Sequence, residues 1–149
     1  MVVLASDHAG YPLKEEIKTH LDEKGIEYTD AGCYSPERYD YAKSAQKACD
    51  MVVSGEADKA ILVCGTGIGI SMAANKVKGI RAACCSDYFS AKYTRAHNDA
   101  NALCMGARVI GAGLAFELVD VFLETEFEGG RHQTRVDQIT AIENGDKVY

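Results

Sequence analysis

The strongest constraint on the fold of this chain is a regular alternation of short apolar runs with segments of helical periodicity. Val2 to Ala5 form the first apolar run, and Leu13, Ile17 and Leu21 then recur at steps of four, which indicates an amphipathic helix. Strands that alternate with helices form a parallel sheet covered on both faces. We therefore expect an α/β fold, a Rossmann-like three-layer sandwich with a five-stranded parallel sheet. The five predicted strands span residues 2–5, 26–29, 60–63, 80–84 and 102–105.

The last segment of the chain departs from this alternation. Val136, Ile139 and Ile142 predict a final helix, and no strand follows it. With only two prolines, no Pro-rich linker divides the 149 residues, so we expect a single domain over residues 1–149. The extra C-terminal helix, within residues 129–149, can either cap this domain or reach a partner subunit.

Composition restricts the partners and the location. No apolar run approaches the roughly 20 residues of a membrane span, so we expect no membrane insertion. A net charge of -6 argues against a general nucleic-acid surface, which needs a concentrated basic stripe. The N-terminus enters an apolar run without the basic segment of a secretory signal, so the expected location is cytoplasmic.

A glycine-rich joint connects the third predicted strand to the next helix. Residues 61–75 read ILVCGTGIGISMAAN, in which Cys64 ends the apolar run and a helix is predicted over 71–75. Between them, residues 65–69 hold three alternate glycines and are here called the glycine turn. A helix N-terminus offers unpaired N–H groups and a positive dipole end, which bind anions and favour the thiolate form of a nearby cysteine. The hypothesis is a reactive thiolate beside an anion site.

Two nucleotide-binding motifs fit the glycine turn poorly. A P-loop is excluded because no Gly-Lys-Ser/Thr ends the motif. The dinucleotide fingerprint G-x-G-x-x-G is closer, and Asp87 lies at a suitable distance downstream to hold a ribose hydroxyl. However, Ile70 stands where the third glycine belongs, and the turn follows the third strand instead of the first. We prefer a cradle of backbone amides that binds an oxyanion.

The six cysteines fall in no C-x-x-C or paired metal-ligand spacing. In a reducing compartment, most of them should be small, buried apolar residues. Only Cys64 has a position that suggests chemistry.

Other polar residues have both a functional and a structural interpretation. Asp7 and His8 follow the first strand, at the sheet edge where such folds bind ligands, but Asp7 could simply cap the next helix and His8 could be solvated. His97 and Asn98 could form an ordinary helix end, because Asn tolerates the left-handed cap.

Residues 129–138, GGRHQTRVDQ, form the one local basic cluster. Arg131 and Arg135 are four residues apart, so on a helix both guanidinium groups lie on one face and can grip a phosphate together. The alternative is that these arginines pair with Asp137 or Glu143.

Taken together and in order, several motifs resemble one family. They are SDHAG at 6–10, CGTGIGISMAANK at 64–76, GIRA at 79–82, RAHNDAN at 95–101 and EGGRHQTRV at 128–136. Over nearly its whole length the chain is similar to the type B ribose-5-phosphate isomerases. That family also includes allose-6-phosphate isomerase activity and the galactose-6-phosphate isomerase subunits.

The resemblance implies a role for each matching residue. Cys64 would be the base that moves a proton between C1 and C2 of an open-chain sugar phosphate, and Thr66 and His97 would assist ring opening. The backbone of the glycine turn would stabilise the enediolate. The residues implied in substrate binding are Asp7, His8, Tyr41, Gly65, Gly67, Ile68, Gly69, Asn98, Arg131 and Arg135. Neither a cofactor nor a metal ion is implied.

In this family the site lies between the subunits of a dimer. The resemblance therefore implies a homodimer with a shared active site, with a tetramer as the alternative. It also gives the helix within residues 129–149 a purpose, because that helix could dock on the partner and carry Arg131 and Arg135 to its sugar.

The chemistry agrees with the residue types. Removing a proton beside a carbonyl requires stabilisation of the enediolate oxygen, which preorganised amides supply, and a thiolate is a competent base. One branch of the family carries a glutamate base in the helix after the glycine turn. Ile70 occupies that position here and cannot accept a proton, so the chain follows the cysteine branch. Ala42 replaces a proline that many relatives have after Tyr41, in a loop at the far end of the sugar.

The predicted function is an aldose–ketose isomerase that interconverts ribose 5-phosphate and ribulose 5-phosphate. A six-carbon aldose 6-phosphate, of the allose or galactose type, is the alternative within the same class. From another class, the alternative is a non-catalytic nucleotide- or phosphate-binding module that uses the same glycine turn. Such a module predicts that Cys64 is dispensable.

Overall fold

All five predicted strands form and pair in parallel. The computed structural model describes residues 1–149 and confirms the α/β fold. The strands are β1 (Val2–Ser6), β2 (Tyr28–Asp30), β3 (Lys59–Cys64), β4 (Ala82–Cys84) and β5 (Ala102–Gly106). They lie in the order β2-β1-β3-β5-β4, so β3 is central and β4 is an edge strand. The sheet has two further borders, at the two ends of its strands. We call the border at the C-terminal ends of the strands the carboxyl edge, and the border at their N-terminal ends the amino edge.

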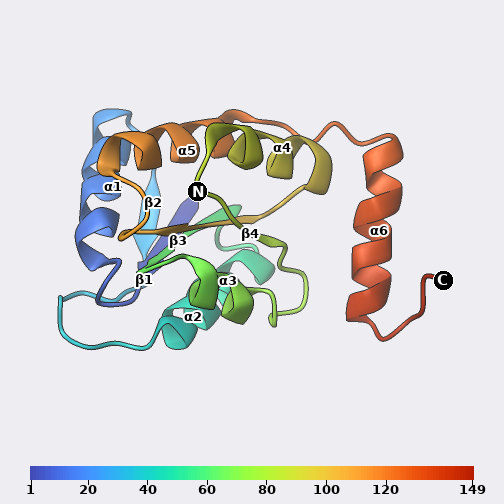
Figure 1. The fold of residues 1–149 in the computed structure, drawn as a ribbon, viewed down its shortest axis with the longest axis horizontal. Coiled ribbons are helices and arrows are strands. Elements are labelled where there is room, and N and C mark those ends of the chain that lie inside the picture. Colours follow the sequence, from blue (N-terminus) through green and yellow to red (C-terminus); the bar gives the residue numbers. More distant parts are fainter.

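Helices cover both faces of the sheet (Figure 1). One face carries α1 (Tyr11–Glu23), α4 (Tyr88–Asn98) and α5 (Ala112–Glu124), and the other carries α2 (Tyr41–Val53) and α3 (Ile68–Ala74). The apolar side chains form two clusters, one on each face. This is the three-layer sandwich that the alternating sequence predicts.

The two-residue period of the strands decides which face each side chain reaches. In β3, Ile61 and Val63 join the cluster under α1 and α5, whereas Leu62 and Cys64 join the cluster under α2 and α3. Cys64 is therefore on the same side of the sheet as the helix into which the chain continues.

Three elements begin two or more residues away from the position that the sequence predicts. Helix α3 begins at Ile68 instead of Ser71, because Gly67 adopts a φ of 79° and turns the chain directly into the helix. Strand β2 begins at Tyr28, since the N–H of Ile26 bonds to Leu21 and closes the end of α1. Strand β4 begins at Ala82, since the N–H of Ile80 bonds to Val77 in a turn.

The last helix, α6 (Arg131–Glu143), stands outside the three layers beside α4 (Figure 1). Val136 is its one buried residue, while Ile139 and Ile142 are 44% and 57% exposed. The Glu143 carboxylate at its far end accepts a hydrogen bond from the N–H of Gly79 at 3.1 Å. None of the helices is both long and apolar enough to cross a membrane.

Candidate active site

Cys64 is the last residue of β3 and lies at the carboxyl edge of the sheet. It is only 3% exposed, and its Sγ accepts a hydrogen bond from the N–H of Gly67 at 3.1 Å. Gly67 adopts the left-handed conformation, in which the chain turns from this contact directly into α3. The glycine turn thus wraps around the thiol and presents it with a donor.

The glycine turn also holds unused backbone donors. The N–H groups of Gly65, Thr66, Gly69 and Ile70 make no hydrogen bond within the chain, whereas the Thr66 Oγ1 accepts one from the N–H of Ile68 at 3.2 Å. Free amides at the first turn of a helix are well suited to hold an oxyanion. The structure therefore supplies both parts of the hypothesis, a sulfur and a set of amides next to it.

Two of the glycines are required by close packing. A Cβ on Gly67 would lie 2.8 Å from the backbone carbon of Met105, and a Cβ on Gly69 would lie 2.8 Å from the ring of Tyr41. Tyr41 is the first residue of α2, so its ring rests directly on the glycine turn. The exposed side chain of Ile68 begins α3 on the same turn.

Asp7 and His8 lie next to this turn at the carboxyl edge. The N–H of Asp7 bonds to Val63, and the Asp7 carboxylate, which is buried, accepts a hydrogen bond from the N–H of Gly10 at 2.9 Å. Gly10, not Asp7, is the N-cap residue of α1, so the capping interpretation of Asp7 is wrong. His8 Nδ1 lies 3.2 Å from the backbone oxygen and 3.3 Å from the backbone nitrogen of Tyr39, which fixes its ring against the loop before α2.

Two residues at this edge escaped the sequence analysis. Arg108 follows β5, and its Nη1 lies 3.2 Å from the position of a Cβ on Gly65, so a guanidinium group without an ion pair adds positive charge at the glycine turn. Cys84 ends β4 and is exposed, which corrects the expectation that only Cys64 has a special position. Burial of its thiol and the neighbouring Cys64 raise the pKa of Cys84. Applying the strand-end rule to the fifth strand would have found Arg108.

The remaining predicted residues lie elsewhere. Helix α4 runs back from the carboxyl edge, so His97 and Asn98 at its end lie near the amino edge. The backbone oxygen of Asn98 accepts a hydrogen bond from Arg81, just before β4, at 3.1 Å. Asp99, not Asn98, takes the left-handed cap position, with a φ of 47°.

Arg131 and Arg135 occupy the first turns of α6, and both are exposed. Arg135 donates to the backbone oxygen of Arg131 at 2.8 Å. Neither arginine pairs with Asp137, which accepts from Gln133, or with Glu143, so the alternative pairing is wrong. Both guanidinium groups remain free of a carboxylate partner.

One chain does not bring these two groups of residues together. The first group surrounds the glycine turn at the carboxyl edge, whereas His97, Asn98 and the α6 arginines lie beside the amino edge. Strand β3 has six residues and a strand rises about 3.3 Å per residue, so the two edges are roughly 17–20 Å apart. A sugar phosphate cannot contact both groups within a single chain.

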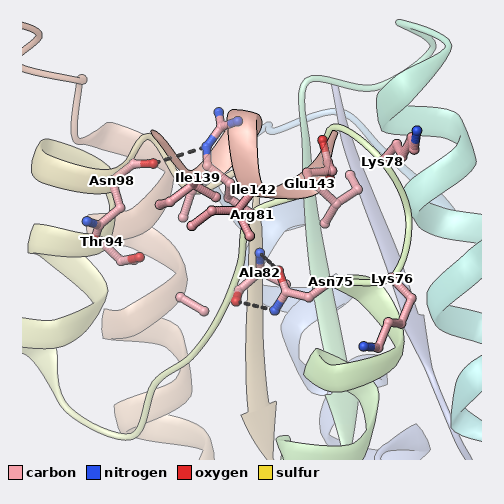
Figure 2. A pocket seen from close by; sticks show the side chains of 13 residues that line it. Asn75, Lys76, Lys78, Arg81, Ala82, Thr94, Asn98, Ile139, Ile142 and Glu143 are labelled. Carbon is pink, nitrogen blue, oxygen red and sulfur yellow. Dashed lines mark hydrogen bonds between the residues drawn. The ribbon is translucent and has the colours of Figure 1, made fainter. Parts of the chain in front are cut away.

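A cavity of about 630 Å³ lies near the amino edge between α6, α4 and β4. Figure 2 shows Ile139 and Ile142 of α6 facing Arg81 and Asn98 across it, and Asn75 bonded to the backbone of Ala82 at its floor. Cys64 does not line this cavity. The largest hollow of the single chain is therefore next to Asn98 and the helix that carries the arginines.

Similar proteins are known for nearly the whole length of this chain. A putative sugar phosphate isomerase of Bacillus subtilis is 55% identical over 95% of this chain and 96% of its own length. Ribose-5-phosphate isomerase B of Escherichia coli is 51% identical over 95% of each chain. Among solved structures, ribose-5-phosphate isomerase B of Clostridium thermocellum has a TM-score of 0.95 at 49% identity, over 97% of each chain. The type B enzyme of Trypanosoma brucei has a TM-score of 0.91 at 45% identity, over 95% of this chain and 97% of its own. The ribose/galactose isomerase family matches residues 2–139, and the chain belongs to this family of isomerases.

Proposed function

We propose that this isomerase interconverts ribose 5-phosphate and ribulose 5-phosphate, with Cys64 as the base. The observation that carries the proposal is the position of the Cys64 sulfur against the glycine turn, where Gly67 donates to it and the amides of Thr66 and Gly69, on either side of Gly67, are free. Relatives named for this activity cover nearly the whole chain, which supports the choice of substrate.

The proton transfer needs only the groups at the carboxyl edge. The Cys64 thiolate takes the proton from C2 of the open-chain aldose, and the electron pair moves onto the carbonyl oxygen to form an enediolate. The free N–H groups of Gly65, Thr66 and Gly69 stabilise the negative oxygen. Return of the proton from Cys64 to C1, with transfer of the hydroxyl proton of C2 to the oxygen on C1, gives the ketose and restores the thiolate.

The other residues bind the substrate and open its ring. Thr66 and His97 shuttle the proton between the anomeric hydroxyl and the ring oxygen. Asp7 and Asn98 bind sugar hydroxyls, and Tyr41 and Ile68 line the space above the glycine turn. The cations that hold the phosphate are His8, Arg131 and Arg135.

These roles require a homodimer with shared active sites. His97, Asn98 and the two arginines lie at the amino edge, too far from Cys64 of the same chain to touch one substrate molecule. A second copy that turns its amino edge toward the carboxyl edge of the first would complete the set. Helix α6, with exposed Ile139 and Ile142, is the segment we propose to dock on the partner subunit. A tetramer built from two such dimers is the alternative, and the cytoplasmic location stays a prediction.

The decisive experiment replaces the proposed base. Cys64→Ala should abolish isomerisation and the exchange of the C2 proton with solvent, while binding of ribose 5-phosphate remains measurable by calorimetry. Cys85→Ala removes a buried thiol outside the site and serves as the control, with activity retained. Isomerase activity in Cys64→Ala would remove the cysteine from its role. A non-catalytic phosphate-binding module instead predicts no isomerisation by the wild type and unchanged binding in Cys64→Ala.

The length of the sugar needs its own measurement. The family name covers both ribose and galactose substrates. Ala42 lies beside Tyr41 in the first turn of α2, not in a loop as expected from the sequence. We expect kcat/KM to be highest for ribose 5-phosphate in a panel that includes allose 6-phosphate and galactose 6-phosphate. A higher value for a hexose phosphate would establish the six-carbon alternative and leave the role of Cys64 intact.

A further inference from the structure

Two histidines and a glutamate meet where α4 ends and α6 begins. Glu128 Oε2 lies 3.7 Å from His97 Nε2 and 3.4 Å from His132 Nε2. The ligand atoms of the three side chains all lie within 4.8 Å of one another. The two imidazole rings stack at 4.0 Å between centroids. No other group of three His, Cys, Asp or Glu side chains in the chain comes this close.

The backbone holds the three residues together. Glu128 donates its N–H to the oxygen of Ala96, the residue before His97, at 3.0 Å. His132 follows four residues after Glu128, in the first turn of α6. Each imidazole packs against its neighbours, His97 against Tyr93 and the ring of His132, and each turns its Nε2 toward Glu128. The positions are fixed, and the nitrogen lone pairs are available.

We propose that His97, Glu128 and His132 bind a divalent transition-metal ion of the zinc type, with three protein ligands and one open position. Two imidazoles and a carboxylate form a donor set that zinc accepts, whereas Mg²⁺ and Ca²⁺ prefer oxygen ligands alone. Around tetrahedral zinc, with bonds of about 2.0–2.2 Å, neighbouring ligand atoms are roughly 3.3–3.6 Å apart. The two distances from Glu128 Oε2, 3.7 Å and 3.4 Å, are close to this spacing. A change in the side-chain torsions of the two histidines would direct both Nε2 atoms toward one ion.

The ion has a consequence for catalysis that rests on the proposed function. Metal binding uses the Nε2 lone pair of His97, so this imidazole can no longer carry a proton during ring opening. Zinc is then an inhibitor of the isomerase and not its cofactor. The metal site itself depends only on the three side chains.

The test of binding is calorimetric titration of zinc chloride into the chelator-treated full-length protein. We expect one ion per chain, and His132→Gln or Glu128→Gln should weaken binding by about tenfold or more, because even changes around metal ligands cost this much. His20→Gln is the matched control, since His20 also pairs with a carboxylate, that of Asp120 at 2.8 Å, but has no third ligand. Magnesium chloride should give no heat of binding.

Two outcomes overturn the site. Zinc binding that is unchanged in His132→Gln would assign the ion to a thiol such as Cys64 or Cys84. Equal weakening in His20→Gln and His132→Gln would show nonspecific binding to surface imidazoles.

The activity assay separates the site from the proposed function. His132→Gln and Glu128→Gln should keep isomerase activity without zinc and lose the inhibition that wild type shows at the zinc concentrations at which it binds. Zinc binding without inhibition would support the site and contradict the role of His97 in ring opening. Inhibition that persists in both variants would overturn the proposed inhibitory site.

Discussion

At the scale of single residues, Gly67 carries the most demanding backbone position of the site. Its φ of 79° belongs to the left-handed region, and an added Cβ would lie 2.8 Å from the backbone of Met105. Its N–H is also the donor to the Cys64 sulfur. Stability and chemistry therefore depend on the same residue.

We expect Gly67→Ala to lower the free energy of unfolding by about 1–3 kcal/mol, because of backbone strain and the contact with Met105. It should also lower kcat, because the N–H of residue 67 moves away from Cys64. Urea denaturation and steady-state kinetics measure the two effects.

The control is Gly113→Ala in α5, where an added Cβ meets nothing within 4 Å. This variant should be as stable as wild type, or more stable by up to about 1 kcal/mol, with unchanged kcat. Equal stabilities of the two variants would mean that the turn tolerates a side chain.

The sequence predicted which residues lie around the glycine turn, and their roles stay a prediction. Gly67 donates to Cys64, Tyr41 packs on Gly69, and Asp7 lies next to the end of β3 through its N–H bond to Val63. Arg108 was missed because it belongs to no motif quoted from the family and its guanidinium reaches Gly65 through the pairing of β5 with β3. Its place after the fifth strand was readable from the sequence, whereas its contact with Gly65 depends on the pairing of β5 with β3, which one sequence does not reveal.

At the scale of elements, a buried charge joins α1 to β2. The Lys14 side chain is fully buried, and its Nζ donates to Asp30 Oδ1 and to the backbone oxygen of Cys33, both at 2.6 Å. Lys18 donates to the other oxygen of Asp30 at 2.9 Å. Burial alone would raise the pKa of Asp30, but the hydrogen bonds from the two lysines hold that pKa below its usual value.

Asp30→Asn leaves the buried Lys14 ammonium with only the more distant carboxylate of Glu15, at 3.8 Å, so the variant should lose about 3 kcal/mol of stability at pH 7. Because the pKa of Asp30 is lower in the folded chain, its contribution is present above the unfolded pKa of about 3.9 and is lost as the pH falls through the folded value.

Urea denaturation between pH 7 and pH 3 should therefore show the gap between wild type and Asp30→Asn narrowing below about pH 4. Asp50→Asn is the control, since Asp50 is exposed on α2 and forms no ion pair. A gap that stays constant to pH 3 would contradict the assigned charge pair.

Helix α6 should act mainly on substrate binding. Arg135→Ala removes a proposed phosphate contact that exists both before and during proton transfer, so KM for ribose 5-phosphate should rise about tenfold or more with a smaller change in kcat. Lys147→Ala, beyond the end of α6, removes a positive charge outside the site and should leave both constants unchanged. A loss confined to kcat would count against the phosphate contact.

At the scale of the whole molecule, the separation of the two residue groups leads to a complementation experiment. In the proposed homodimer, Cys64→Ala lacks the proposed base and His97→Ala lacks the residue from the opposite edge, so each variant alone should be inactive. In a mixed dimer, one of the two shared sites combines an intact Cys64 with an intact His97.

Co-expression of the two variants with equal amounts of each should restore about a quarter of wild-type activity, because half of the dimers are mixed and each of these has one intact site. Purification through two different tags would raise this to about half. No restored activity in verified mixed dimers would mean that each chain builds its site alone.

The global fold was predictable because its signals are local and repeated. Alternating apolar runs indicated five strands and a parallel sheet. The predicted starts of β2 and β4 were two residues too early, because Ile26 and Ile80 are apolar but form turns before these strands. The separation of His97 from Cys64 is a property of topology, because α4 must run back across the sheet. Motifs alone do not tell a reader which edge each residue occupies.

The placement of the two residue groups at opposite edges also predicts how defects combine in mixed populations of chains. In the proposed dimer, a chain that lacks one of the two groups inactivates one of the two shared sites when it pairs with an intact chain. A chain that lacks both Cys64 and His97 inactivates both sites. Doubly substituted chains would therefore be dominant-negative inhibitors of intact chains. Newly synthesised chains would be inactive until they pair with a second copy.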